Sequence, residues 1–227
     1  MKIAEIKLVN NYKGVNLSYN DPKWAGCEEI LVNEVRVESK GSLPLTRVKL
    51  SACSEGINGI FKVEDSSILA RYKRDQEPVW RDSCVEIYLK PGNVKGYMNF
   101  EFNCIGTLLC SYITNHERTE DGFKEWRFVA DEDCEAVGRK TSLSESYAQE
   151  VEFGKEWYLE FFIPLSMLKK YFGEIEIAEG EEWYCNLYKC GDDLQNPHWI
   201  SWSPVRELNF HNPDDFGKIK FIQSFIS

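Results

Sequence analysis

The stretches Cys84-Val-Glu-Ile-Tyr-Leu89 and Tyr97-Met-Asn-Phe-Glu-Phe-Asn103 decide the fold of this chain. Hydrophobic residues alternate with polar ones in both, and the same pattern returns in Trp157-Tyr-Leu-Glu-Phe-Phe162 and Trp183-Tyr-Cys-Asn-Leu-Tyr188. Successive residues of a β-strand point to opposite faces of the sheet. The alternation therefore predicts strands with one buried face and one polar face.

The predicted polar face has an unusual composition. Carboxylates, amides and phenols interleaved with tryptophans suit a neutral polyhydroxyl ligand, whereas an ordinary solvated face is richer in Lys, Thr and Ser. We therefore expect this face to bind sugar. Its predicted members are Glu86, Tyr88, Tyr97, Asn99, Glu101, Asn103, Tyr158, Glu160, Tyr184, Asn186 and Tyr188.

Short segments rich in β-branched and aromatic residues recur along the rest of the chain. Asn58-Gly59 and Pro91-Gly92-Asn93 are turn signals between such segments. Many short strands with such turns predict an all-β sandwich or barrel. One segment, residues 164–172, predicts a short helix because Pro lies in its first turn and Gly173 follows its end.

Length and composition bound the possibilities. With 227 residues, of which 43% are hydrophobic, the chain can form one large core, and we expect a single domain over residues 1–227. A formal net charge of -10 opposes contact with nucleic acid. No run approaches the roughly 18 apolar residues of a membrane helix. Met1-Lys-Ile-Ala-Glu-Ile-Lys7 lacks the apolar core of a signal peptide, so the chain as it stands is expected to be cytoplasmic, or exported if a leader has been removed.

The cysteines show no sign of a shared function. Eight are present, at positions 27, 53, 84, 104, 110, 134, 185 and 190, without any CxxC pair. The spacing fits no zinc site. We expect free, buried thiols that act as small hydrophobic residues.

Several motifs resemble family 9 carbohydrate-binding modules. The segment Pro78-Val-Trp-Arg-Asp-Ser-Cys-Val-Glu-Ile-Tyr-Leu89, followed by residues 97–103, is similar to the centre of that family. Further matches follow in order over roughly residues 25–222, and they comprise Trp157-Tyr-Leu-Glu-Phe-Phe-Ile-Pro164, Tyr184-Cys-Asn-Leu-Tyr188, Trp199-Ile-Ser-Trp-Ser-Pro204 and Phe210-His-Asn-Pro-Asp-Asp-Phe-Gly217.

This resemblance implies an antiparallel β-sandwich of jelly-roll type that binds mono- or oligosaccharides or the end of a polysaccharide chain without catalysis. It also implies that two tryptophans clamp the terminal sugar. Trp80 matches the first clamp position, and either Trp199 or Trp202 matches the second. One departure is that residues 97–103 contain no arginine.

The sugar hydroxyls need hydrogen-bond partners beneath the clamp. Glu86 and Glu160 are expected to accept hydrogen bonds, and Asn103 and Asn186 to donate and accept them. Arg81 is expected to add charge-assisted donors if it turns inward. Tyr188 completes the expected set of sugar-binding residues.

No cofactor is required by this reading, although the resemblance implies possible structural calcium. Asp82, Asp214 and Asp215 are either turn caps or calcium ligands, and the chain has no contiguous calcium loop. The sequence leaves any metal site unassigned.

Two alternatives belong to other classes of function. A related sandwich that carries b-type haem for electron transfer would use Met98 with His198 or Lys189 as axial ligands. A glycosidase would use Glu86 with Glu101 or Glu160. The sequence contains no GxSxG or HExxH motif, so we expect no enzyme activity.

Overall fold

The computed structural model describes residues 1–10, 14–92 and 94–223. Its strands are β1 (Ile3–Leu8), β2 (Glu29–Val32), β3 (Glu34–Val35), β4 (Leu45–Cys53), β5 (Gly56–Ala70), β6 (Cys84–Pro91), β7 (Tyr97–Asn103), β8 (Leu108–Thr119), β9 (Gly122–Phe128), β10 (Gly138–Thr141), β11 (Tyr147–Pro164), β12 (Glu182–Gly191), β13 (His198–Ser201) and β14 (Gly217–Gln223). Its helices are η1 (Pro22–Trp24), η2 (Val79–Arg81), α1 (Asp131–Ala136), α2 (Leu165–Phe172) and η3 (Pro213–Asp215).

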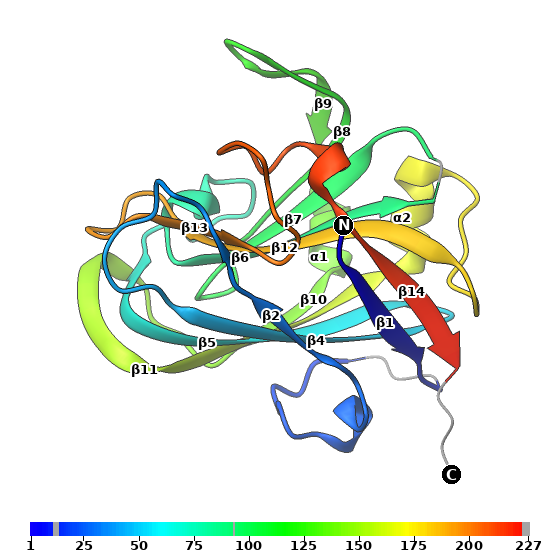
Figure 1. Ribbon diagram of the computed structural model, residues 1–227, viewed down its shortest axis with the longest axis horizontal. Coiled ribbons are helices and arrows are strands. Elements are labelled where there is room, and N and C mark those ends of the chain that lie inside the picture. Colours follow the sequence, from blue (N-terminus) through cyan, green and yellow to red (C-terminus); the bar gives the residue numbers. More distant parts are fainter. Residues whose placement is uncertain (11–13, 93, 224–227) are drawn as a thin grey trace.

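The strands form two layers packed face to face (Figure 1). Sheet 1 contains β10, β11, β5 and β4, with β2 beside β4. Sheet 2 contains β14, β12, β6, β7, β8 and β9, with β13 beside β12 and β3 beside β13. Strand β1 links the layers because it pairs in parallel with both β14 and β4. The predicted β-sandwich is confirmed.

The alternation of the sequence separates the two faces of sheet 2. Val85 and Ile87 on β6 and Phe100 and Phe102 on β7 are fully buried in the main core between the sheets. Glu86 and Glu101, which lie between them in sequence, point away from that core and toward the outer face. A period of two thus places the polar series on the side opposite the sandwich interior.

The predicted helix is present as α2, which buries Met167 and Leu168 and ends at Gly173, where φ is 76°. The short helix α1 was not predicted from the sequence. Its first turn is acidic, as the partial positive charge of a helix N-terminus favours. No helix among the described residues is long and apolar enough to cross a membrane.

Strand β11 corrects one expectation about the polar face. This strand pairs with β5 and β10 in sheet 1, so Tyr158 and Glu160 do not share a face with Glu86 and Glu101. Alternation predicts the face of a strand but not the sheet that the strand joins.

The cysteines are free as expected, and all but Cys27 are buried.

Candidate functional site

A pocket of about 680 Å³ opens on the outer face of sheet 2. Strands β6 and β7 provide its floor, and the turn that contains η2 forms one side. The hairpin β8–β9, which projects beyond the two layers in Figure 1, forms another side. Its polar floor and aromatic sides match the general character of small-molecule sites.

The floor is built from side chains that face one another across neighbouring strands. Glu86 on β6 lies directly opposite Glu101 on β7, and Tyr88 lies opposite Asn99. Asn99 in turn lies opposite Ser111 on β8. All five side chains are buried and line the pocket.

Each floor carboxyl has one oxygen engaged with the protein and one without a partner. Glu101 Oε1 accepts hydrogen bonds from the Tyr88 hydroxyl at 3.0 Å and from Asn99 Nδ2 at 2.6 Å. Glu86 Oε1 accepts one from Cys190 Sγ at 3.0 Å. Oε2 of each carboxyl is buried and has no hydrogen-bond partner among the residues that the structure describes. Both residues line the pocket, so their carboxyls are floor groups that lack a full set of protein partners.

Burial dominates the electrostatics of the floor. It raises the pKa of Glu101 to about 7, and it raises the pKa of Glu86 well above the usual range, with the nearby charge of Glu101 as the second cause. Asp192, beside the pocket, also has a raised pKa because it is buried. The floor therefore resists carrying two negative charges at neutral pH.

His211 joins the floor to the surrounding loops. Its Nε2 lies 3.0 Å from the Tyr88 hydroxyl and its Nδ1 lies 3.0 Å from the Tyr97 hydroxyl. Because the single hydrogen of the Tyr88 hydroxyl goes to Glu101, that hydroxyl accepts from Nε2–H and Nδ1 accepts from Tyr97. Burial holds the pKa of His211 well below its usual value, so the ring is neutral.

Aromatic rings form the sides of the pocket. Trp80, with 36% of its surface exposed, and half-buried Trp199 line one part. The Trp199 indole donates from Nε1 to Asp192 Oδ1 at 2.8 Å, which fixes the ring. Phe123 and Trp126 on hairpin β8–β9 line another part. Such rings offer flat apolar surfaces to the C–H face of a pyranose.

Trp80, Glu86 and Trp199 are the predicted site residues that line this pocket. Tyr188 lies directly behind it: its ring stacks on Phe210 at a centroid distance of 4.1 Å, and its hydroxyl donates to Phe210 O. Phe210 itself lines the pocket.

Arg81 lies outside the pocket. Its guanidinium carbon lies 5.4 Å from the centroid of the Trp80 ring, and its Nε pairs with Asp193 at 3.4 Å. It is not among the residues that line the pocket, so the inward turn that the expected donors would need is not seen.

Asn103 and Asn186 are engaged with the backbone instead of the pocket. Asn103 Nδ2 donates to Tyr72 O at 2.8 Å, and its Oδ1 accepts from Thr107 N. Asn186 Oδ1 accepts from Ser203 N at 2.8 Å while its Nδ2 donates to Ser203 O. Both side chains are fully buried and tie loops to sheet 2.

Trp202 and Glu160 also lie outside the pocket. Trp202 is buried in the main core, close to Gly217. Glu160, in sheet 1, is fully buried in an ion pair with Lys23 and accepts a backbone hydrogen bond from Asn16 N at 3.1 Å. Of the two tryptophans proposed for the second clamp position, the pocket therefore contains Trp199.

The aspartates considered as calcium ligands bind protein groups. Asp82 Oδ2 accepts from the backbone of Arg71 and Tyr72 and from Asn103 Nδ2. Asp215 accepts from Arg206 and from Asn212 Nδ2. Asp214 donates its backbone N–H to the side chain of Asn212 in the first turn of η3. These contacts are those of turn caps and loop anchors.

One buried group in the described part of the chain has atoms near enough to share an ion: the possible ligand atoms of Cys84, Glu86 and Cys190 lie within 4.8 Å of one another. Calcium binds oxygen ligands, so two thiols do not suit it. Burial raises the pKa of Cys84 to about 12, so this thiol is protonated at neutral pH.

The residues considered for haem do not form a cofactor site. Met98 is fully buried in the main core. Lys189 Nζ lies 2.8 Å from His198 Nε2, both side chains are buried, and none of the three lines the pocket. Lys189 Nζ also lies 3.5 Å from Oδ2 of buried Asp65, with which it forms an ion pair.

Several pocket residues were not singled out from the sequence as site residues. Asn99 appeared only as a member of the polar face, and Glu101 appeared there and as a carboxylate of the glycosidase alternative. Their pairing with β6 is the signal that could have placed them in the site. Arg118, Trp126 and His211 come from a hairpin and a loop, where no periodicity marks a binding residue.

Fold and pocket together define a carbohydrate-binding β-sandwich. The model of the family described as carbohydrate-binding family 9 matches residues 24–221. The chain belongs to carbohydrate-binding family 9, which confirms the resemblance found in the sequence. Carbohydrate binding, the function predicted from the polar face, is confirmed at the level of this family.

Solved structures agree with this assignment. A candidate carbohydrate-binding protein from Bacteroides uniformis ATCC 8492 is 28% identical, with a TM-score of 0.85 over 97% of this chain and 99% of that chain. A family 9 module from Caldicellulosiruptor kristjanssonii in complex with glucose is 13% identical, with a TM-score of 0.65 over 100% and 98% of the two chains. A structure of a family 9 module from the same organism with cellotriose has 13% identity and a TM-score of 0.64 over 98% and 94%. Comparison with curated proteins gave no match.

Proposed function

We propose that the pocket binds the terminal sugar of a mono- or oligosaccharide without catalysing a reaction. The observation that carries this proposal is the arrangement of Trp80 and Trp199 beside a floor with two unpartnered carboxyl oxygens. The apolar face of the ring packs against indole, and the hydroxyls reach Glu86 and Glu101. The glucose and cellotriose complexes of family 9 modules from Caldicellulosiruptor kristjanssonii support this choice of ligand class.

The positions of the acids favour binding over hydrolysis. Glycosidases place two carboxyl groups on opposite sides of the scissile bond. Glu86 and Glu101 instead lie next to each other in one floor, and Glu160 belongs to the other sheet. Both floor carboxyls would therefore contact the same side of a bound sugar.

A titration followed by tryptophan fluorescence and calorimetry tests this function. Glucose, xylose, cellobiose and xylobiose form the panel, with added calcium and separately with a chelator, because structural calcium is a property that the resemblance implies. We expect saturable binding, weakened at least about tenfold in Trp80→Ala because stacking an indole on a sugar buries apolar area worth on the order of 1.5 kcal/mol or more.

Tyr158→Ala provides the matched control. Tyr158 is a half-exposed aromatic residue on sheet 1, away from the pocket, and its ring lies 6.0 Å from that of Tyr19. Its removal should leave sugar affinity unchanged. A flat response to every sugar, or equal losses in the two variants, would count against a clamp at Trp80.

A further inference from the structure

The pocket floor carries acidic groups without a matching cation. Among the described residues, no Lys or Arg forms an ion pair with Glu86 or Glu101. The titratable nitrogen near Glu101 is His211 Nε2, which lies 3.9 Å from Oε1. His211 is neutral because burial holds its pKa well below the usual range. Buried carboxylates in proteins are normally paired with a cation.

The charged groups around the floor do not supply that cation. Asp192 and Asp121 add further acidic groups to the lining of the pocket. Arg118 also lines the pocket, from the exposed part of hairpin β8–β9. Among the described residues it forms no ion pair with Glu86 or Glu101, and its charge influences the pKa of Glu101 less than burial does. Tyr88, Asn99 and Cys190, the remaining polar neighbours, donate to Oε1 of the two carboxyls.

Within the described part of the chain, the hydrogen-bond donors of the protein therefore reach the same oxygen, Oε1, in both floor carboxyls. Both Oε2 atoms are buried and unpartnered there, and they belong to residues that line the pocket. A ligand group that satisfies both oxygens must donate more than one hydrogen bond. A hydroxyl has one hydrogen to donate, whereas an ammonium group has three and also carries a positive charge.

We infer that this pocket prefers a sugar with a free, protonated amino group, a hexosamine, over the corresponding neutral sugar. The inference rests on the proposed function and names the ligand class of the same site. The ammonium group would lie between Glu86 and Glu101 and donate to the free Oε2 of each. Charge-assisted hydrogen bonds of this kind are roughly twice as strong as neutral ones.

Calorimetry with three closely matched ligands tests the inference. Glucosamine, glucose and N-acetylglucosamine differ at one position, which carries an ammonium, a hydroxyl or a neutral amide. At neutral pH we expect glucosamine to bind about tenfold more tightly than glucose, the difference between a charged and a neutral hydrogen-bonding group. N-acetylglucosamine should show none of this gain, and glucuronic acid should bind more weakly than glucose because its charge repels the floor.

Glu101→Gln separates charge from structure. The Gln oxygen can still accept from Tyr88 and Asn99, so the floor keeps its internal hydrogen bonds. We expect the glucosamine-to-glucose ratio of affinities to fall toward one, with some loss of glucose affinity as well, because the proposed site also places a sugar hydroxyl on Glu101. Glu86→Gln should act in the same direction. Glu182→Gln, which alters an exposed carboxylate paired with Lys218 at 2.8 Å, is the control and should preserve the ratio.

Proton release gives a readout beyond affinity. Because burial raises the pKa of both floor acids, part of the pair is protonated in the empty pocket near pH 7. A cation stabilises the ionised forms, so glucosamine binding should release protons at pH 7, and the heat of binding should depend on the ionisation enthalpy of the buffer. Glucose binding should show a smaller dependence.

The outcomes distinguish this inference from the proposed function. If glucose binds but glucosamine binds equally well or more weakly, the preference for an amino sugar is wrong and the sugar site stands. If the wild-type chain binds none of these ligands or the wider panel, the proposed function itself fails. A preference for glucosamine that survives in both Gln variants would also overturn the role assigned to the floor carboxyls.

Discussion

Lys23 and Glu160 form an ion pair that the fold buries almost completely. The pair fastens the segment around η1 to sheet 1, and two backbone N–H groups, of Asn16 and Leu17, also donate to Glu160 Oε2. Breaking a buried pair is costly because the remaining charge stays in a poorly solvated place. Glu160 therefore stabilises the fold, and it lies in sheet 1, not in the pocket floor on sheet 2.

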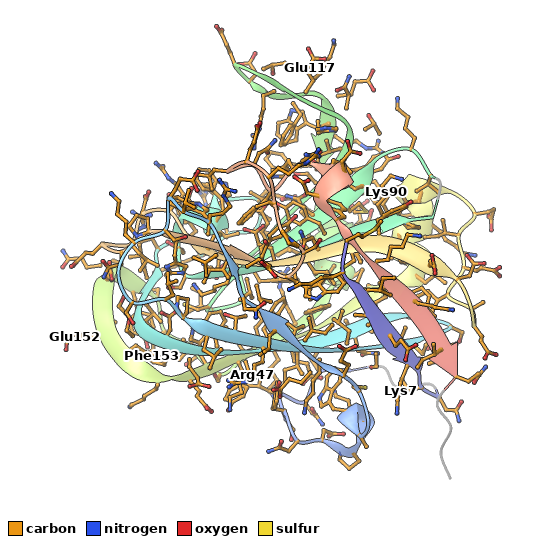
Figure 2. The ribbon with its side chains drawn as sticks, in the orientation of Figure 1. Lys7, Arg47, Lys90, Glu117, Glu152 and Phe153 are labelled. Carbon is orange, nitrogen blue, oxygen red and sulfur yellow. The ribbon has the colours of Figure 1, made fainter. Side chains whose placement is uncertain are left out.

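Glu160→Gln is accordingly expected to lower the free energy of unfolding by about 3–5 kcal/mol, since the substitution breaks the buried ion pair with Lys23. Urea denaturation measures the loss. Glu152→Gln is the control, because Glu152 is exposed on the same strand and is labelled at the edge of the molecule in Figure 2. Sugar affinity should be unchanged in both variants. Reduced affinity at full stability would place Glu160 in the binding site after all.

Hairpin β8–β9 is the element that sets the extent of the pocket. It contributes Arg118, Phe123, Trp126 and Phe128 to the lining, and Phe128 is 47% exposed. Phe123 lies against His211 with a centroid distance of 4.5 Å, so the hairpin is braced against the floor. The aromatic surface of the hairpin extends the site beyond the part beside Trp80 and Trp199.

Trp126→Ala should therefore weaken binding of a trisaccharide more than binding of a monosaccharide. Loss of one aromatic contact corresponds to about 0.5–1.5 kcal/mol, or roughly two- to tenfold in affinity. Calorimetry with glucose and cellotriose measures both. Lys124→Ala is the control on the same hairpin: its ammonium pairs at 2.9 Å with Glu117, which Figure 2 labels on the projecting hairpin, and it does not line the pocket. Equal losses for the two ligands would contradict an extended site.

At the scale of the whole molecule, strand β1 holds the layers together. It lies between β14 and β4 and pairs in parallel with both. Gly217 begins β14, where a Cβ atom would lie 2.7 Å from Trp202 Cζ3 and 2.9 Å from Lys2 O. Glycine thus permits the close approach of β14 to β1 and to the core tryptophan.

Gly217→Ala should destabilise the fold by about 1–3 kcal/mol, because the added methyl group overpacks this junction. Thermal unfolding measures the change, and sugar affinity below the transition should stay as in the wild type. Gly138→Ala is the control, since its Cβ would meet its nearest neighbour at an ordinary 3.5 Å. A Gly217 variant as stable as the control would show that the junction has room to relax.

Local pattern was enough to predict strands β6, β7, β11 and β12, helix α2 and the outward direction of Glu86, because side-chain direction along a strand follows from its period of two. The order of motifs also identified the family. Glu101 was visible as part of the same polar series, and its place directly opposite Glu86 follows from the pairing of adjacent strands.

Tertiary structure decided which of the similar residues share a site. Glu86 and Glu160 have the same local pattern, yet β6 and β11 belong to different sheets, and only the long-range pairing of strands separates them. Trp199 and Trp202 lie three residues apart, but one lines the pocket and the other enters the core. Such choices depend on contacts between distant segments, which alternation along one strand does not encode.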